Sequence, residues 1–262
     1  MRIDIMTLFP DTVNAVLHES IIGRAAKKGI IEINCVQIRD YTENKQCQVD
    51  DYPYGGGWGC VMMAQPLKSC LDDIMSTAKD KRSRVIYMSP QGKPYDQATA
   101  RRLRDDYDHL VLVCGHYEGV DERFLEECVD EELSLGDFVL TGGEIPAMAV
   151  ADCLCRMVPG VLPEESCYTD ESHWNGLLEY PQYSRPEEWH GRKVPEVLLS
   201  GHHGNVADWR TRESYKRTMA RRPDLWEKFD LTQVHSRHEK KVLAQALEEF
   251  RQEQGSAAET EE

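Results

Sequence analysis

Three glycine-containing segments stand out because each one follows a predicted strand. Residues 88–92 follow the apolar run 85–88, residues 114–119 follow the run 110–114, and residues 135–146 lie between a short strand and a helix. Glycine permits positive φ angles and close backbone approach, so main-chain groups in such turns can contact a ligand directly. A single glycine turn of this kind is only weak evidence of a binding site, because tight connections between strands and helices need glycine in any case. Three of them at the carboxyl ends of parallel strands predict a binding site for a small molecule.

A fourth glycine-rich segment, residues 50–59, matches neither of the two common phosphate-binding motifs. A P-loop ends in Gly-Lys-Ser or Gly-Lys-Thr, and the dinucleotide fingerprint is Gly-x-Gly-x-x-Gly between a strand and a helix. Nucleotide binding of those two kinds is therefore not predicted.

The segment 209–222 carries six basic residues and a single acid, Glu213, in a chain whose formal net charge is −15. A protein of that overall charge repels phosphate unless basic residues gather on one surface. The segment is consistent with a solvated helix face and with a face that contacts nucleic-acid phosphates. The acids concentrate elsewhere, in residues 118–137 and 248–262.

The chain has 262 residues, of which 40% are hydrophobic, and this predicts one large domain or one domain with a smaller companion. Its longest apolar stretch, residues 110–114, is far shorter than the roughly 20 residues that cross a bilayer. Residues 1–10 lack an export signal. Nine cysteines without a Cys-x-x-Cys pair predict reduced thiols rather than disulfides or a zinc site. We therefore expect a cytoplasmic protein that does not insert into membranes.

Alternating extended and helical patterns predict an α/β fold, with a mostly parallel sheet covered by helices. Strands are predicted over residues 2–8, 31–38, 85–88 and 110–114. Helices are predicted over residues 67–78, over residues 97–106 with Asp96 as the N-cap, and over residues 146–157.

Pro159 and Gly160 end the last of these helices, and the first domain is predicted to span residues 1–160. Residues 161–176 are polar and aperiodic, which predicts a linker. Residues 177–250 predict a small C-terminal helical domain, with helices over 203–220, 223–229 and 231–250. The acidic residues 251–262 are predicted to form a frayed, solvated tail.

The chain resembles the bacterial tRNA (guanine-N1)-methyltransferases, which belong to the knotted SPOUT methyltransferases. The motifs that carry the resemblance lie in residues 8–10, 23–25, 49–51, 53–57, 87–92, 113–123, 134–146, 159–162, 177–186 and 195–201. The resemblance implies a deep trefoil knot over residues 85–146, an exception to the unknotted rule. It also implies methyl transfer from S-adenosylmethionine to N1 of the guanosine at position 37 of tRNA, which lies 3′ of the anticodon. The family acts as a homodimer with a composite active site and responds to Mg²⁺, for which the sequence marks no ligands.

By the same resemblance, the three glycine segments bind the donor in a bent conformation. The residues that match are Tyr87, Ser89, Pro90, Gln91, Gly115, Glu118, Gly119, Leu135, Gly136, Phe138, Leu140, Gly142, Gly143 and Pro146. A carboxylate such as that of Glu118 offsets the positive charge of the donor. Glu118 is therefore counted among the catalytic candidates as well.

Methylation of guanine N1 requires a base, because N1 bears a proton, and a group that stabilises charge on O6. Arg156 matches the O6-stabilising arginine of the family. The family's base is an aspartate in the linker, but residues 169–173 here read Thr-Asp-Glu-Ser-His. This departure puts Glu171 in the base position and Asp170 just before it. Either carboxylate can act as the base, and we favour Glu171.

Contacts with tRNA are expected from the basic segment, because arginine and lysine bind phosphate without reading sequence. The candidates in this segment are Arg210, Arg217 and Arg221, and Arg24 and Asp50 are further tRNA-binding candidates outside it. A flipped guanosine needs neighbours that flank it, for which the candidates are Tyr117, His173 and Trp174.

Two further residues depart from the family pattern. His116 stands where many relatives carry arginine, and Trp58 stands where many carry a smaller residue. His116 lowers the fixed positive charge of its loop, which argues against a role in holding a phosphate or carboxylate at neutral pH, or it is simply a solvent-facing loop residue.

Two other functions remain open on the sequence alone. A metal-dependent hydrolase would use Asp137, Glu144 or the acids of residues 118–121, but the chain lacks a metal-ligand spacing such as His-x-x-x-His. An RNA-binding module without catalysis leaves the three glycine segments unexplained. Binding of S-adenosylmethionine distinguishes these possibilities.

Overall fold

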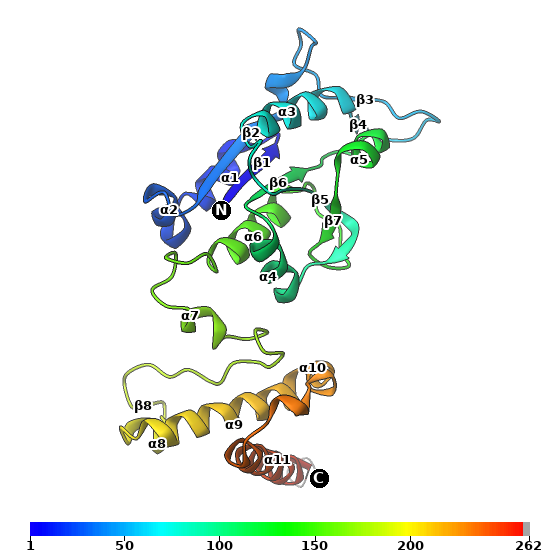
Figure 1. Ribbon diagram of the computed structural model, residues 1–262. Coiled ribbons are helices and arrows are strands. Elements are labelled where there is room, and N and C mark those ends of the chain that lie inside the picture. The colour runs from blue at the N-terminus through cyan, green and yellow to red at the C-terminus, as the bar shows by residue number, and fades with distance from the viewer. Residues whose placement is uncertain (259–262) are drawn as a thin grey trace. The chain divides into compact units, whose positions relative to one another are not determined.

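A five-stranded parallel sheet forms the centre of the N-terminal part of the chain (Figure 1). The computed structural model describes residues 1–258, with side chains up to residue 255. The strand order is β2-β1-β6-β5-β7. The strands are β1 (Arg2–Thr7), β2 (Glu32–Gln37), β5 (Ser83–Pro94), β6 (His109–Cys114) and β7 (Glu131–Ser134). The four strands predicted from apolar patterns are therefore confirmed.

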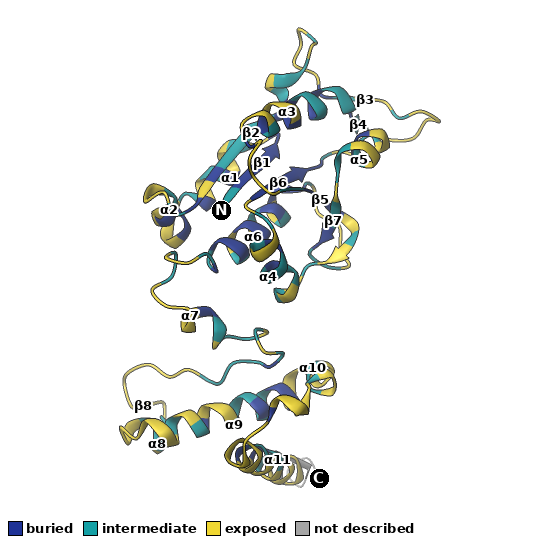
Figure 2. Ribbon diagram, in the orientation of Figure 1, coloured by how far each residue is buried: buried dark blue, intermediate teal, exposed yellow. Residues whose placement is uncertain are grey.

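Helices cover both faces of this sheet, which confirms the α/β prediction. They are α1 (Pro10–Leu17), α2 (Ser20–Lys27), α3 (Ala64–Ser76), α4 (Gln97–Asp106), α5 (Glu122–Cys128) and α6 (Glu144–Cys155). Helices α1, α2, α4 and α6 pack on one face, and α3 and α5 pack on the other. Strand β6 is buried at every position (Figure 2). Its alternate side chains enter the two cores.

The predicted cap of α4 is present, since the carboxylate of Asp96 accepts a hydrogen bond of 2.7 Å from the backbone N–H of Thr99. The bonds to Thr99 and Ala98 outweigh the effect of burial and hold the pKa of Asp96 below its ordinary value.

Strand β5 is longer than predicted and is interrupted. Its pairing with β7 shifts register between Met88 and Lys93, so residues 89–92 bulge out of the ladder rather than follow the strand as a free loop. A Cβ atom on Gly92 would lie 2.5 Å from the backbone nitrogen of Leu133. Only glycine permits this approach of the bulge to β7.

A short hairpin that the sequence did not predict precedes α3. It consists of β3 (Asp50–Asp51) and β4 (Val61–Met62), after the turn η1 (Ile38–Tyr41). The connecting loop extends away from the sheet (Figure 1), and the side chains of Tyr52 and Trp58 on it are exposed.

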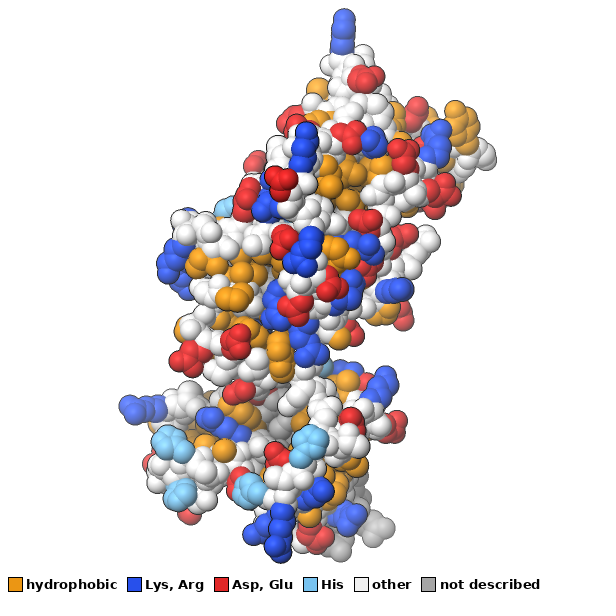
Figure 3. Space-filling view, viewed as in Figure 1, with side chains coloured by type: hydrophobic (Ala, Val, Ile, Leu, Met, Phe, Trp, Pro, Cys, Tyr) orange, Lys and Arg blue, Asp and Glu red, His pale blue; other side chains and the backbone are white. Residues whose placement is uncertain are grey.

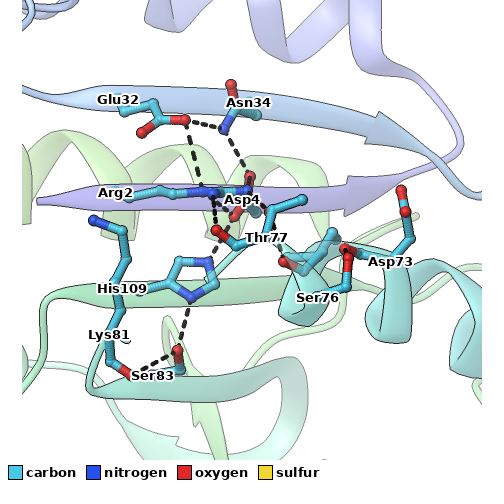
Figure 4. Close-up of polar contacts among 11 residues, drawn as sticks. Arg2, Asp4, Glu32, Asn34, Asp73, Ser76, Thr77, Lys81, Ser83 and His109 are labelled. Carbon is cyan, nitrogen blue, oxygen red and sulfur yellow. Dashed lines mark hydrogen bonds and ion pairs between the residues drawn. The ribbon is translucent and has the colours of Figure 1, made fainter. Parts of the chain in front are cut away.

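A buried polar cluster joins three strands near their amino ends (Figure 4). The carboxylate of Asp4 lies 2.6 Å from Nε2 of His109 and accepts bonds from Arg2 at 2.7 Å and from Asn34 at 2.8 Å. Burial raises the pKa of Asp4, but the bonds to His109, Arg2 and Asn34 together hold it below its ordinary value of 3.8. The cluster therefore stabilises the charged carboxylate inside the fold.

The chain divides into two compact units, with the boundary after Glu165. The elements of the second unit are α7 (Ser166–Thr169), β8 (Glu188–Trp189), β9 (Arg192–Lys193), α8 (Glu196–Leu199), α9 (His203–Arg221), α10 (Pro223–Lys228), η2 (Leu231–Gln233) and α11 (Arg237–Ala258). Its core joins Leu177 to Tyr215, Met219 and Ala246. Within the described residues, no helix has the length and apolar character needed to span a membrane.

The second unit differs from the sequence prediction at both ends. The unit boundary falls within the predicted linker 161–176, because α7 and the buried Tyr168 already belong to the helical unit. Helix α11 continues to Ala258, beyond the predicted end at residue 250, so part of the predicted tail 251–262 is helical. The last four residues of that tail lie outside the described residues.

Candidate active site

A cavity of about 310 Å³ lies at the carboxyl ends of β5, β6 and β7. Its walls come from the bulge in β5, from residues 115–120 after β6, and from residues after β7 up to the start of α6. The predicted donor residues that line it are Tyr87, Ser89, Pro90, Gln91, Gly115, Glu118, Gly119, Leu135, Phe138, Leu140, Gly142, Gly143 and Pro146. The three segments singled out in the sequence thus surround one space.

Gly136 is the predicted donor residue that does not line this cavity. It shapes the third segment instead. The hydroxyl of Ser134 accepts a bond of 3.1 Å from the Gly136 N–H and donates one of 2.9 Å to the Gly136 carbonyl. The φ angle of Gly136 is +153°, which glycine adopts at low cost.

The second and third segments meet backbone to backbone. The N–H of Gly143 donates a hydrogen bond of 3.0 Å to the carbonyl of Gly115. A Cβ atom on Gly143 would lie 2.6 Å from the Cα of Cys114, and one on Gly115 would lie 2.6 Å from the hydroxyl of Tyr87. These glycines therefore allow a contact between segments that any side chain would block.

Glu118 lines the cavity and contacts the β3–β4 hairpin, which the sequence did not predict. Its backbone N–H donates a bond of 3.0 Å to the carbonyl of Cys60. A Cβ atom on Gly59 would lie 2.5 Å from Oε1 of Glu118, so glycine at this position leaves room for the carboxylate. The hairpin thus supports the wall of the cavity.

His116 does not face solvent as the sequence suggested, and this interpretation was wrong. Its side chain is 15% exposed, and its Nε2 lies 2.6 Å from Oε2 of Glu144, whose side chain is 8% exposed. The other oxygen of Glu144 accepts a bond of 2.6 Å from the hydroxyl of Thr7. The sequence carries no local signal of this cluster, because Thr7 and Glu144 are 137 positions apart.

Within the first unit, Glu118 lines the cavity and the catalytic candidate Arg156 does not. Arg156 is half-buried at the C-cap of α6, whereas Gly143 and Pro146 at the other end of this helix line the cavity. Asp170 and Glu171 belong to the second unit. Asp170 is exposed on the wall of a cavity of about 460 Å³ within that unit, together with Tyr180 and Arg210, and Glu171 is half-buried.

The candidates for flanking a nucleobase differ in their surroundings. Tyr117 is exposed at the first unit's cavity, with a φ angle of +59°. His173 is exposed in the second unit, also with a positive φ of 73°. The ring of Trp174 packs against that of the buried Tyr168, with 5.1 Å between ring centroids.

The basic segment forms most of helix α9, and acids within the same unit neutralise half of its charge. Arg212 lies 3.4 Å from Glu249, Lys216 pairs with Glu213, Glu249 and Glu253, and Arg222 pairs with Asp224. Burial lowers the pKa of Lys216, but the bonds to Glu253 and Glu213 outweigh it and raise that pKa. On the visible face of the molecule, Lys and Arg are likewise intermixed with Asp and Glu (Figure 3).

The three arginines of α9 that were predicted to bind tRNA differ in their surroundings from these paired residues. The guanidinium of Arg210 lies 4.7 Å from the centroid of the Tyr180 ring, Arg217 is half-buried and Arg221 is exposed. The other two tRNA candidates lie in the first unit. Arg24 is exposed on α2, and Asp50 is half-buried in β3.

No cluster of three or more His, Cys, Asp or Glu side chains in the described residues has an arrangement that could hold a metal ion.

A cavity walled by glycine turns at the carboxyl ends of parallel strands is typical of ligand-binding α/β proteins. The sequence matches the family model described as "tRNA (Guanine-1)-methyltransferase TrmD" over residues 1–228, and the chain belongs to this family. The resemblance detected from the motifs is therefore confirmed.

Curated proteins support the same assignment. The chain is 56% identical over 229 residues to a protein of Ruminiclostridium cellulolyticum, in a match that covers 87% of this chain and 97% of the relative. It is 50% identical to a protein of Alkaliphilus oremlandii, covering 88% and 94%, and 52% identical to one of Lachnospira eligens, covering 87% and 96%. Each of the three relatives is named tRNA (guanine-N(1)-)-methyltransferase.

Proposed function

We propose that this protein transfers the methyl group of S-adenosylmethionine to N1 of guanosine 37 in tRNA. The single observation that best supports this proposal is the cavity that the three glycine segments enclose together. Its volume of about 310 Å³ is at the lower end of the roughly 300–1,000 Å³ found for small-molecule sites. The name shared by the relatives agrees with this reaction.

In this proposal, the donor binds in the cavity with its adenine against backbone groups of the glycine turns. The carboxylate of Glu118 on the cavity wall offsets the positive sulfonium. The close backbone contact of Gly143 with Gly115 suits a deep trefoil knot over residues 85–146, which the family also implies. Such a knot fixes the three segments relative to one another before the donor binds.

The chemistry at the acceptor needs two more groups. We assign the removal of the N1 proton to the carboxylate of Glu171, with Asp170 as the alternative, and the stabilisation of charge on O6 to the guanidinium of Arg156. The nitrogen lone pair that remains attacks the methyl carbon, and the carbon–sulfur bond breaks to leave a neutral thioether. Alignment and exclusion of water supply much of the rate enhancement.

We propose a homodimer with a composite active site, which the family resemblance implies, since Arg156 of the first unit does not itself line the donor cavity. The donor cavity of one protomer is then completed by the partner's Glu171. A set of exposed apolar side chains, some on the cavity wall and some beside it, supports an interface there. They are Phe9, Tyr117, Phe138, Val139, Leu140 and Ile145.

We propose that tRNA binds through its phosphates to Arg210, Arg217 and Arg221 on α9. These three positions follow one another at i, i+7 and i+11, which puts them on one face of the helix. Arg24 and Asp50 are proposed as further contacts, and Tyr117 is proposed to stack on the extruded guanine.

Two features of the proposal depend mainly on the family. Activity is proposed to require Mg²⁺, as the family resemblance implies, and its ligands are not assigned. A cytoplasmic location is proposed as well, and the nine free cysteines are consistent with a reducing compartment.

The proposed function is tested with labelled S-adenosylmethionine and two tRNA transcripts that differ only at position 37. We expect one methyl group per transcript with guanosine at this position and none with adenosine. Methylated N1 cannot form a Watson–Crick pair, so reverse transcription of the product should stop at position 37. Donor binding without transfer would favour an RNA-binding module, and metal-dependent cleavage of the transcript would favour a hydrolase.

A further inference from the structure

A buried cluster of three side chains lies directly behind the donor cavity. The carboxylate of Glu144 is 7% exposed and interacts through both of its oxygens, with the hydroxyl of Thr7 at 2.6 Å and with Nε2 of His116 at 2.6 Å. His116 itself lines the cavity, whereas Thr7 and Glu144 do not. Of the three residues, His116 is therefore the one that borders the cavity.

The donor and the acceptor can be assigned in each of the two hydrogen bonds of Glu144. The hydroxyl of Thr7 accepts a bond of 2.9 Å from the backbone N–H of Phe9, so its own hydrogen is available to Glu144. The carboxylate is an acceptor only, so Nε2 of His116 must carry the hydrogen of the second bond. Glu144 is also the first residue of α6, where the helix dipole favours a negative charge.

The ring of His116 is confined from several sides. The edge of the Phe9 ring packs against it with 5.1 Å between centroids, and its backbone N–H lies 3.2 Å from the sulfur of Met62. A Cβ atom on Gly142 would lie 2.2 Å from Cε1 of the ring. The imidazole thus fills the place that a side chain at Gly142 would occupy, and it holds the second and third segments together.

We propose that Thr7, Glu144 and His116 act as positioning residues for the donor, by locking the segment after β6 to the start of α6. This inference rests on the proposed function, since it concerns the same cavity. It predicts that the hydrogen bond at Nε2 of His116, and not merely the presence of a ring, determines the affinity for S-adenosylmethionine. The same bond should matter little for tRNA.

The chain offers a matched control on the same strand. His109, at the start of β6, is fully buried, and its Nε2 lies 2.6 Å from Asp4, which is 1% exposed (Figure 4). Neither residue lines the donor cavity. The two pairs have the same chemistry and the same separation, but only the pair of His116 borders the cavity.

The test uses the full-length protein and titration calorimetry with S-adenosylmethionine, together with thermal unfolding and the KM values for donor and tRNA. In His116→Asn the amide cannot reach Glu144, and we expect Kd and KM for the donor to rise about tenfold, the effect of one lost bond to a charged group. His116→Gln places an amide N–H near the position of Nε2 and should restore most of the affinity. His109→Asn should lower the Tm but leave the donor Kd unchanged.

Thr7→Val and Thr7→Ser provide an independent pair in case a change at His116 prevents folding. The valine variant loses the bond to Glu144 and should weaken donor binding, whereas the serine variant keeps the hydroxyl and should bind normally. An unchanged donor Kd in His116→Asn and Thr7→Val, or an equal rise in His109→Asn, would overturn the inference while the proposed function stands. If the wild-type protein did not bind the donor, the proposed function would fail, and this inference with it.

Discussion

Substitution of Gly143 by alanine tests whether the backbone contact between the second and third segments builds the donor cavity. The new Cβ would lie 2.6 Å from the Cα of Cys114, about 0.8 Å closer than the 3.4 Å at which ordinary contact begins. The φ angle of Gly143 is −82°, so alanine introduces no backbone strain there. The effect of Gly143→Ala is therefore purely steric.

The size of the effect follows from the contacts that must give way. Overpacking costs about 1–3 kcal/mol, and loss of the bond from Gly143 to Gly115 costs about 1 kcal/mol more. We expect the free energy of unfolding to fall by about 2–4 kcal/mol, which lowers Tm by roughly 4–16 °C for a unit of this size. Because the cavity wall moves with the segments, the donor Kd should rise more than tenfold.

The assay combines thermal unfolding with calorimetric titration of S-adenosylmethionine. Gly204→Ala is the matched control, because this glycine lies in α9 and its Cβ would meet only His202, at 3.8 Å. Alanine there should stabilise the helix by about 0.5–1 kcal/mol and leave the donor Kd unchanged. A Gly143→Ala protein that binds the donor normally would refute the argument that the glycines create the cavity by close backbone approach.

Three further experiments address the acceptor, the tRNA and the fold. Glu171→Gln should reduce kcat for methyl transfer by about 10²–10⁴-fold with an unchanged donor Kd, measured by single-turnover kinetics. The double change Arg217→Gln with Arg221→Gln should raise the KM for tRNA and reduce the salt dependence of tRNA binding by about 1 unit of slope per arginine. Arg212→Gln is the control and should change neither quantity, because Arg212 is already paired with Glu249. Asp4→Asn should lower stability at pH 7 by about 3–5 kcal/mol, measured by denaturant unfolding.

The Asp4 prediction has a definite dependence on pH. Its pKa in the folded state is below the ordinary 3.8, so its contribution to stability is present above that value and is lost as the pH falls through the folded-state pKa. The wild-type protein should thus lose its advantage over Asp4→Asn below about pH 4. A constant difference in stability between pH 7 and pH 2 would contradict this account.

The assignment of the catalytic base is tested by a comparison of two variants. A larger loss of kcat in Asp170→Asn than in Glu171→Gln would transfer the role of the base to Asp170.

Local patterns were sufficient to predict elements whose structure depends on near neighbours. The continuous apolar run of β6 matches its burial at every position, and the Asp96 cap fixes the start of α4. The bulge in β5 could not be predicted, because it depends on the approach of Gly92 to β7, some forty residues further along the chain. The β3–β4 hairpin was missed because each of its strands has two residues, too few for a period to be seen.

The candidate site shows the same division. Its glycine turns carry a pattern within each segment, and the structure brings those segments around one cavity. The surroundings of His116 depend on Thr7 and Glu144, which lie on other elements, so its local sequence suggested only a loop residue. A histidine is versatile enough that its partners, and not its neighbours in sequence, define what it does.

The basic segment shows how far charge counts along a sequence can mislead. Between Trp209 and Arg222 the sequence has an excess of five positive charges, yet Lys216 is surrounded by three carboxylates, two of them from α11. A cation that is paired with carboxylates has less net charge to offer a phosphate than one that is not. The three arginines proposed to contact tRNA, Arg210, Arg217 and Arg221, are at spacings that share one face of α9. A protein that repels nucleic acid as a whole can thus still bind it along a single helix face, provided that the contact is shorter than the screening length of about 8 Å at physiological salt.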